Sequence, residues 1–510
     1  MRLSRRNLKN ISSLPEDAKP LEKIFSLPEK VLQFGTGVLL RGLVDYFIDK
    51  ANRNGIFNGR IVVVKSTEKG TVTEFDKQDN LYTLCIRGAE EQSEIEEFSI
   101  NSSISRVLQA RENWSEILRC AHNPALNIII SNTTEVGIRF SPDNIHSSPP
   151  ASFPGKLLAF LVERFKVFGG AKESGMIIIP TELLVDNGSK LLSIVLELAE
   201  LNKVEANCIE WIKNSNHFCN SLVDRIVPGK LSKDETVIIE KRLGYSDELM
   251  ITAEPYRLWA IETANKDVLK ALSFSRADKG VIIAPDIEKF RELKLRLLNG
   301  THTFSCGLAF LAGLETVKDA MNADFMALYI HHLIFNEIAA VMSNERIPYD
   351  DACKFADDVI SRFNNPFINH HWLRITLQYS EKMKIRNVPL LIKSYKKLAD
   401  PPRYMSLGFA AYILYMKSIR IESGNFIGQR NGTEYTIQDD KAATLMDKWK
   451  SDSIDKVVND ILTDRELWGV DLFLLNGFAD TVKNNLYSLM KNGVRVTIEN
   501  LLENKTVALS

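Results

Sequence analysis

Residues 30–42 read KVLQFGTGVLLRG, so that an apolar run (KVLQF) leads through Gly35 and Gly37 into a helix-forming segment. A short apolar run of this kind is typical of a strand that is covered on both faces. Three similar runs follow: RIVVVKS (60–66), NIIIS (127–131) and MIIIP (176–180). Amphipathic segments between and after them predict helices at 40–52, 156–167 and 190–201. The repeated strand–helix–strand order predicts a parallel sheet with helices on both faces.

The sequence pattern changes after residue 285, where helical spacing of apolar residues replaces the short strand-like runs. The segments with this spacing are 287–299, 303–343, 350–363, 371–397 and 403–420. A last strand-like run, VIIAP (281–285), meets a charged helix start at the Ala284–Pro285 step. The second half of the chain is therefore predicted to be mainly helical.

Length and composition exclude several classes of protein. The 510 residues are enough for two to four domains, and 64 Lys+Arg against 65 Asp+Glu leave no broad basic face for nucleic acid. The longest apolar stretches, around 304–314 and 407–416, are too short to cross a bilayer. The N-terminus is basic at first but lacks the apolar core of a secretion signal, so we expect a cytoplasmic leader arm and a cytoplasmic protein.

The cysteines and histidines do not form an obvious metal or disulfide framework. The six cysteines are scattered and include no C-x-x-C pair, which indicates reduced, mostly structural thiols. Two histidine pairs occur, His331–His332 and His370–His371, but neighbours on a helix point about 100° apart and cannot easily share one ion. We predict no metal site.

The glycines after the first run stand where a nucleotide-binding chain has its phosphate turn. Such a turn lets backbone N–H groups approach a pyrophosphate, and the helix N-terminus adds positive charge. The complete dinucleotide fingerprint has a third glycine at position 40, where this chain has Leu40. Spacing alone therefore leaves two interpretations open, a nucleotide site or a tight strand-to-helix turn.

The end of the second run carries the residues that would distinguish between two cofactors. NAD-binding chains usually place an acid there for the ribose hydroxyls. Lys65 stands in this place and favours the 2′-phosphate of NADP, whereas Glu68 is near enough in sequence to reach the ribose of NAD. The spacing does not decide between them.

Lys294, Asn299 and His302 form a second candidate site, at the start of the helical half. At about 100° per residue, Asn299 lies about 140° and His302 about 80° from Lys294, so a continuing helix gathers them on one broad face. Apolar neighbours disfavour an ammonium ion, which suits the lysine to general base catalysis, and the other two groups can stabilise an oxyanion. The alternative is a lysine that extends to water, a helix that ends at Asn299-Gly300, and a satisfied core histidine.

The two segments together, G-x-G-x-L-x-R (35–41) and K-x4-N-x2-H (294–302), resemble the polyol-specific long-chain dehydrogenase family of mannitol dehydrogenases and hexuronate reductases. The resemblance covers most of residues 28–400. Five segments are most similar to family members that interconvert D-tagaturonate and D-altronate: LQFGTGVLLRG (32–42), IISNTTEVGI (129–138), IIPTELLVDNG (178–188), SLVDRIVPG (221–229) and LRLLNGTHT (295–303). This likeness implies a metal-independent, NAD-dependent enzyme of hexuronate breakdown, with fructuronate or mannitol specificity as the alternative.

The resemblance also implies a role for each candidate residue. Lys294 matches the general acid/base, and Asn299 and His302 match the groups that hold the reacting oxygen. Arg374 and Lys382 match a cationic pair at the substrate. The cofactor-binding candidates are Phe34, Gly35, Thr36, Gly37, Val38, Leu39, Arg41, Lys65, Ser131, Asn132 and Thr133.

The chain departs from the family pattern at one position. Polyol dehydrogenases of the family have an Asn after the acid of a C-[DE]-N segment, and here Glu182 is followed by Leu183. Asn187, a few positions on, is the candidate replacement for this oxyanion donor at the substrate.

Together these patterns predict three parts: an N-terminal arm (1–28), a Rossmann-like NAD-binding domain (29–285) and a mainly helical catalytic and substrate domain (286–510). The expected partner is a small-molecule sugar acid, without nucleic acid or membrane, and the protein is expected to be a monomer or a small homo-oligomer. The alternative from another class is a nucleotide-binding scaffold that has lost its chemistry. Such a scaffold would keep the glycine turn and lack the Lys–Asn–His set, which this chain contains.

Overall fold

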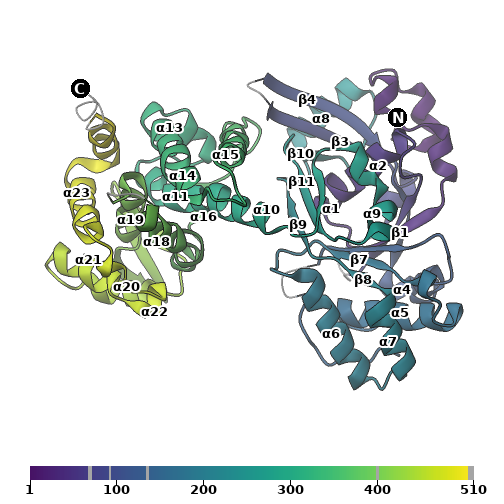
Figure 1. Cartoon of the computed structure of the whole chain (residues 1–510). Helices are drawn as coiled ribbons and strands as arrows, with labels where there is room; N and C mark the ends of the chain where they lie inside the picture. The colour runs from purple at the N-terminus through teal and green to yellow at the C-terminus, as the bar shows by residue number, and fades with distance from the viewer. Residues whose placement is uncertain (67–71, 91–92, 134–136, 398–400, 504–510) are drawn as a thin grey trace. The chain divides into compact units, whose positions relative to one another are not determined.

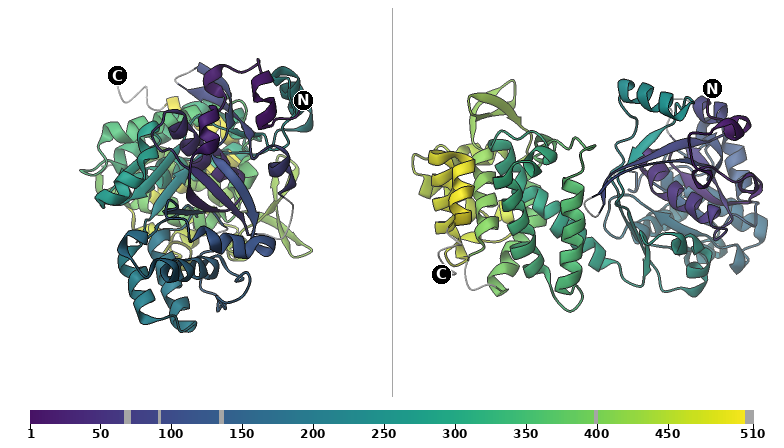
Figure 2. Two further views of the ribbon diagram at one scale, coloured as in Figure 1. Left: turned by 90° about the vertical axis from the view of Figure 1, so that its right-hand side faces the viewer. Right: turned by 90° about the horizontal axis from the view of Figure 1, so that it is seen from above.

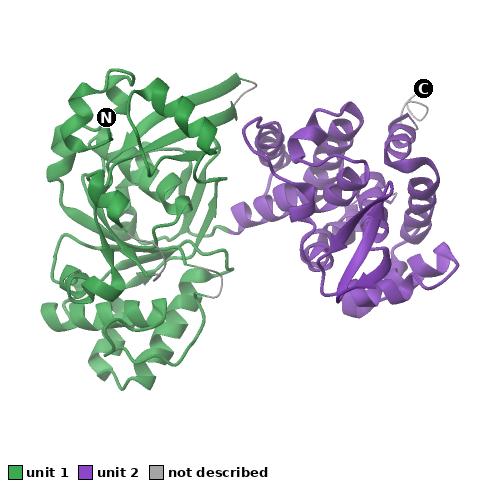
Figure 3. Cartoon of the chain, turned by 180° about the vertical axis from the view of Figure 1, so that it is seen from behind, with its two compact units in different colours: residues 1–287 green, residues 288–510 purple. Residues whose placement is uncertain are grey.

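The computed structural model describes residues 1–66, 72–90, 93–133, 137–397 and 401–503. The chain forms two compact units, residues 1–287 and 288–510 (Figure 3). The first unit contains a parallel sheet with helices, and the second is mainly helical, which confirms the predicted fold class.

The first unit is built on a six-stranded parallel sheet in the order β5-β2-β1-β6-β7-β8 (Figure 1). The strands are β1 (Glu29–Phe34), β2 (Arg60–Lys65), β5 (Ile104–Gln109), β6 (Ile128–Ser131), β7 (Ile177–Pro180) and β8 (His217–Phe218). The four predicted strands are β1, β2, β6 and β7. The strand order reverses between β1 and β6, and ligands of doubly wound folds bind at the carboxyl ends of the strands at such a point.

Helices cover both faces of this sheet because successive side chains of each strand point to opposite faces. Along β1, Val31 belongs to the core on one face, and Leu32 and Phe34 belong to the core on the other. One face is covered by α1 (Val38–Gly42), α2 (Val44–Arg53) and α9 (Lys266–Ala271). The other is covered by α4 (Ala110–Cys120), α5 (Phe153–Phe168), α6 (Asn187–Leu201) and α7 (Ala206–Ser215).

Two smaller sheets complete the first unit, in the orders β10-β3-β4 and β12-β11-β9. Their strands are β3 (Tyr82–Glu90), β4 (Ser93–Asn101), β9 (Ser221–Asp224), β10 (Ile251–Ala253), β11 (Leu258–Glu262) and β12 (Val281–Ala284), and the remaining helices are α3 (Thr73–Lys77) and α8 (Lys233–Leu243). The predicted last run therefore forms β12, outside the main sheet. Residues 1–28 form three short 3₁₀-helices, and Leu3, Ile11 and Leu14 are buried with Leu243 and Tyr245.

The second unit packs many short helices around a buried pair, α11 and α19. Its helices before residue 345 are α10 (Glu288–Leu293), η6 (Lys294–Gly300), α11 (Thr301–Leu311), α12 (Val317–Met321), α13 (Asp324–His331), η7 (His332–Ala339) and α14 (Ala340–Met342). The later ones are α15 (Tyr349–Phe363), α16 (Trp372–Ile375), α17 (Tyr379–Lys382), η8 (Met383–Asn387), α18 (Val388–Lys397), α19 (Arg403–Tyr415), α20 (Ala442–Lys448), α21 (Ile454–Leu462), α22 (Arg465–Trp468) and α23 (Phe478–Glu503). Among these, η6, η7 and η8 are π-helical.

The second unit also contains a three-stranded antiparallel sheet that the helical spacing does not predict. It is formed by β13 (Ser418–Glu422), β14 (Asn425–Arg430) and β15 (Thr433–Ile437) and stands beside the helices (Figure 2). Tight turns with Gly424 and Gly432 at positive φ connect its strands. The predicted helix 403–420 accordingly ends at Tyr415.

One described segment, Asp324–Met342, is long and apolar enough to cross a membrane by length and composition alone. It comprises α13, η7 and α14, and 56% of its most apolar window is buried inside the second unit. The core helix of a folded domain is buried in the same way. The segment is therefore only weak evidence for a membrane span.

Candidate active site

The glycine turn after β1 is shaped by a close approach of two strand ends. Gly35 has a φ of +132°, and a Cβ at this position would lie 2.9 Å from the backbone oxygen of Asn132. Its N–H donates to the carbonyl of Val64, which links the turn to β2. Gly37 has an ordinary φ of −61°, and a Cβ there would meet nothing within 4 Å. Gly35 is thus required by the fold, whereas Gly37 leaves open space beside the turn.

The close-packing glycine of the turn is Gly42, which the sequence analysis did not identify. A Cβ at Gly42 would lie 2.8 Å from Cγ1 of Val227, so only glycine allows this segment to contact the loop after β9. Leu43, the next residue, has non-helical dihedral angles and separates α1 from α2. The helix predicted at 40–52 is confirmed except at Leu43, where it divides into α1 and α2.

Arg41 is buried and holds the turn from inside the unit. Its Nη1 donates to the carbonyl of Leu249 at 2.8 Å, and its guanidinium lies over the rings of Tyr82 and Phe75. Asp45, one helical turn later, is completely buried, which raises the pKa of its carboxyl to about 8. This carboxyl is therefore mostly protonated at neutral pH. Arg41 faces protein groups in this structure, and its predicted contact with a cofactor stays a prediction.

The other cofactor-binding candidates lie at the carboxyl ends of β1, β2 and β6. Phe34 and Lys65 are buried, and Thr36, Val38 and Leu39 are partly exposed. Glu68 lies outside the described residues. The candidates after β6 are held by Glu182, a buried carboxylate that accepts hydrogen bonds from the Ser131 hydroxyl and from the backbone and hydroxyl of Thr133.

Asn187 is fully buried at the start of α6. Its Nδ2 donates to the carbonyls of Pro180, Glu182 and Ser221, and its Oδ1 accepts from the backbone N–H groups of Gly188 and Ser221. Because both atoms of the amide are engaged with the backbone, this geometry does not support the predicted contact with a substrate oxyanion. Asn187 instead ties the ends of β7 and β9 together.

Lys294 and Asn299 lie on the π-helix η6, and the helix continues without a break into α11, which carries His302. The predicted alternative, a helix that ends at Asn299-Gly300, was therefore wrong. The angle of about 140° between Lys294 and Asn299 was calculated for an α-helix and does not apply to a π-helix. In a π-helix the hydrogen bonds run between residues five positions apart, so these two residues stand on the same face. Both side chains are partly exposed.

His302 is buried among aromatic rings, and its Nε2 has no hydrogen-bond partner in the described part of the chain. The ring stacks on Phe363 at 4.4 Å and meets His370 edge-on at 5.1 Å. Burial, followed by the charges of neighbouring cations and His370, holds the pKa of His302 well below its usual value. The imidazole is therefore neutral and keeps one ring nitrogen available for a ligand.

The charges of several cations act on His302, and the sequence predicted only some of these residues. Lys382 donates from Nζ to the carbonyl of Ile375 at 2.9 Å, and Arg374 is exposed on α16. Arg362 and Arg386 are the two that were missed, and their charges also lower the pKa of His302. Arg386 stands four residues after Lys382, a spacing that on a helix places two side chains on one face and could have revealed it.

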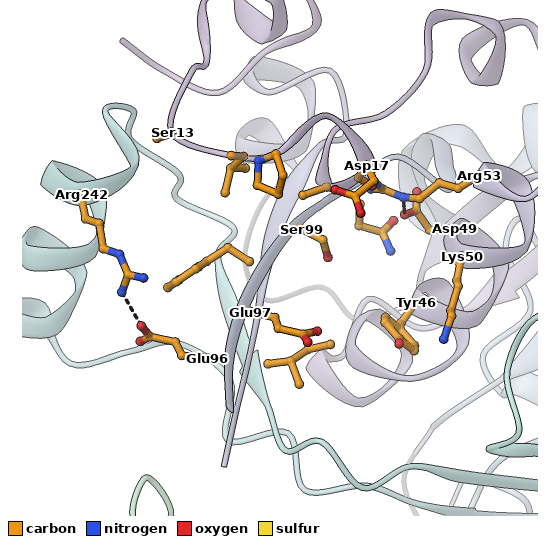
Figure 4. A pocket seen from close by; sticks show the side chains of 16 residues that line it. Ser13, Asp17, Tyr46, Asp49, Lys50, Arg53, Glu96, Glu97, Ser99 and Arg242 are labelled. Carbon is orange, nitrogen blue, oxygen red and sulfur yellow. Dashed lines mark hydrogen bonds and ion pairs between the residues drawn. The ribbon is translucent and has the colours of Figure 1, made fainter. Parts of the chain in front are cut away.

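A separate cavity of about 610 Å³ lies in the first unit and is lined by none of the candidate site residues (Figure 4). Ion pairs within its lining join Arg53 to Asp49 and Arg242 to Glu96. Among the residues that the structure describes, no group of three His, Cys, Asp or Glu side chains is arranged to hold a metal ion.

Comparison with known proteins places the chain among dehydrogenases. The family model of the mannitol dehydrogenase Rossmann domain matches residues 29–272, and that of the mannitol dehydrogenase C-terminal domain matches residues 286–490. An altronate oxidoreductase of Halalkalibacterium halodurans is 36% identical over 490 residues, which cover 94% of both chains. The altronate oxidoreductase of Shigella flexneri is 34% identical over 485 residues, which cover 93% of this chain and 97% of the relative.

Solved structures show the same fold. Pseudomonas fluorescens mannitol 2-dehydrogenase, in a ternary complex with NAD and D-mannitol, has a TM-score of 0.70 at 23% identity and covers 99% of this chain and 100% of its own. A D-sorbitol dehydrogenase in substrate-free form has a TM-score of 0.77 at 20% identity, and the match covers 98% of this chain and 100% of that chain. At these identities the likeness concerns the fold.

Proposed function

The chain belongs to the mannitol dehydrogenase family and is a polyol or sugar-acid dehydrogenase, and from this premise we propose that it interconverts D-tagaturonate and D-altronate with NAD as cofactor. The relatives at 34–36% identity are altronate oxidoreductases, which supports this choice of substrate. We also propose that the enzyme is cytoplasmic, acts as a monomer or a small homo-oligomer, and needs no catalytic metal.

The observation that carries the proposal is the excess of positive charge around His302. Arg386 and Lys382 both act on its imidazole, are partly buried, and form no ion pair within the described residues. Grouping several cations away from water is costly unless an anion joins them. A sugar acid brings such an anion, whereas a neutral polyol does not.

In this proposal Lys294 gives a proton to the reacting oxygen during reduction and takes it back during oxidation. Asn299, on the same face of η6, donates a hydrogen bond to that oxygen, and His302 contributes its unpartnered Nε2. Because His302 is neutral, it orients the oxygen without competing with Lys294 for the proton. π-Helical segments often mark functional sites, which agrees with the position of Lys294 and Asn299.

The glycine turn and the ends of β1 and β6 fit a dinucleotide. The open space beside Gly37 is where a backbone can approach a pyrophosphate, and Gly42 provides the close packing of helix on strand. Ser131, Asn132 and Thr133 stand at the point where the strand order reverses. When bound, NADH supplies the hydride that reduces the keto group.

Gly37→Ala tests whether the glycine turn binds a dinucleotide or is only a tight turn. The added methyl group meets no protein atom within 4 Å and the backbone angles suit alanine, so the melting temperature should change little. The methyl group would occupy the proposed pyrophosphate space, so the Kd for NADH should rise about tenfold or more. Fluorescence titration with NADH measures the affinity, and an unchanged Kd would favour the tight-turn interpretation.

The proposed function is tested with a substrate panel of tagaturonate, fructuronate and fructose, each with NADH and with NADPH at one pH. We expect tagaturonate to be preferred over fructose by at least about tenfold in kcat/KM, because a neutral substrate leaves a buried cation without its anion, and 1.4 kcal/mol is one decade. Equal values for fructose and tagaturonate would refute the sugar-acid assignment. A preference for fructuronate would instead assign the chain to the other hexuronate epimer.

A further inference from the structure

Arg386 lies on the π-helix η8. Hydrogen bonds between η8 and the π-helix η6 hold this segment in place. Arg296 of η6 donates from Nη1 to the carbonyls of Ile385 and Arg386, both at 2.7 Å. Asn387 of η8 donates from Nδ2 to the carbonyl of Gly300 at 3.4 Å. The backbone at Arg386 is therefore fixed relative to the segment that carries Asn299 and leads to His302.

The side chain of Arg386 is anchored at one end and has no acidic partner. Its Nη1 donates to Oγ1 of Thr303 at 3.2 Å, and that hydroxyl in turn donates to the carbonyl of Asn299 at 2.8 Å. Burial lowers the pKa of the guanidinium, and no carboxylate in the described part of the chain forms an ion pair with it. A guanidinium has five N–H donors, so most of them remain for a ligand.

A second, independent observation points to a ligand in the same place. His302 precedes Thr303 and is buried, and its Nε2 has no partner among the described residues. Buried polar atoms of native proteins are almost always hydrogen-bonded, and a catalytic role is one of the reasons for an exception. The imidazole of His302 has no partner, and Arg386 near it has no acidic partner among the described residues. Together these groups suit a ligand that carries a hydroxyl or keto oxygen for the histidine and an anionic group for the arginine.

Lys382 adds a second positive charge on the same side of this segment. Its charge lowers the pKa of His302, and the charge of Arg386 lowers the pKa of Lys382, so the three groups are near one another. Lys382 is half-buried and forms no ion pair within the described residues. Arg374, in contrast, is exposed on α16, where water can solvate its charge.

We infer that Arg386, with Lys382 beside it, binds the carboxylate of the sugar acid and determines the preference for acidic over neutral substrates. This inference rests on the proposed dehydrogenase function and replaces Arg374 by Arg386 as the principal carboxylate ligand. A planar guanidinium matches a carboxylate with two parallel hydrogen bonds, which a lysine cannot provide.

The test compares Arg386→Gln with the wild-type enzyme on tagaturonate and fructose, with NADH, in the full-length chain. We expect the KM for tagaturonate to rise by at least about tenfold, since a charge-assisted hydrogen bond is lost, while kcat falls less. The ratio of kcat/KM for tagaturonate to kcat/KM for fructose should fall by at least about tenfold, because fructose has no carboxylate for Arg386 to bind. Arg386→Lys should restore part of the preference.

Lys384→Gln is the matched control, because Lys384 lies on the same π-helix and its Nζ donates to the carbonyl of Glu466 at 3.5 Å. It removes the same charge and should leave the substrate preference unchanged. The inference is overturned if Arg386→Gln lowers kcat/KM for both substrates in parallel, or if its KM for tagaturonate stays at the wild-type value. The inactivity of the wild-type enzyme on tagaturonate together with activity on fructuronate would contradict the proposed epimer, and the Arg386 comparison would then be made with fructuronate.

Discussion

Replacing Lys294 with alanine is expected to lower kcat for tagaturonate reduction by about 10²–10⁴-fold, the usual contribution of a general acid or base. The reduced oxygen must receive a proton, and in the proposed site Lys294 gives it. Asn299 and a neutral His302 can hold the oxygen but cannot replace the lysine as proton donor. The affinity for NADH should change little, because the proposed cofactor-binding residues lie in the first unit.

Steady-state kinetics and an NADH titration of the same preparation provide the measurement. The control is Lys289→Ala, which removes a lysine on the preceding helix whose Nζ pairs with Asp351. This variant should keep its turnover. If Lys294→Ala kept more than about a tenth of wild-type kcat, the loss would be smaller than acid–base catalysis contributes, and the role of Lys294 would be contradicted.

Replacing Glu337 with alanine is expected to lower the free energy of unfolding of the second unit by about 2–5 kcal/mol. Glu337 lies on η7 and is buried, and its two carboxylate oxygens accept the backbone N–H groups of Tyr404 and Met405 at 2.8 and 2.7 Å. These N–H groups belong to the first turn of α19, which has no acceptor of its own for them. The substitution leaves both donors buried and opens a cavity beside a core helix.

Thermal or urea unfolding of the full chain measures this loss, and an unchanged transition would contradict it. Glu337→Gln is the matched variant, because it keeps one oxygen acceptor and cannot titrate. Burial raises the pKa of Glu337 to about 7, so between the unfolded value of about 4.3 and pH 7 the folded state retains a proton that the unfolded state has lost. The wild type should therefore lose stability relative to Glu337→Gln as the pH rises from 5 to 8.

The sequence determined the architecture of the first unit because its signals are local. Short β-branched runs can only be strands covered on both faces, and β1, β2, β6 and β7 lie where these runs lie. Gly35 at the end of β1 is visible in the sequence as a turn, and its φ of +132° confirms that only glycine fits. Four of the six strands of the main sheet, and the turn after β1, could thus be predicted from residues adjacent in sequence.

Other features of the structure depend on contacts between residues that are distant in sequence, and the local sequence pattern does not predict them. Gly42 is required by Val227, and Asn187 is engaged by strand ends that include Ser221; neither partner can be identified from the local pattern. The short strands β13, β14 and β15 have partly exposed, mixed faces, so their pattern was too weak to separate from the helices around them.

The candidate catalytic set shows the same division between sequence and structure. The sequence determined that Lys294, Asn299 and His302 share one helical segment, since a polar residue at each position interrupts an apolar run. The tertiary structure alone decided the helical geometry there. Backbone carbonyls of the π-helices η6 and η8 accept hydrogen bonds from side chains of the other helix. Arg296 donates to the carbonyl of Arg386 and Asn387 to that of Gly300, and each pair is about 90 residues apart in sequence. Because this pairing joins residues that are distant in sequence, no α-helical angle calculated from the sequence could predict the π-helical geometry of η6.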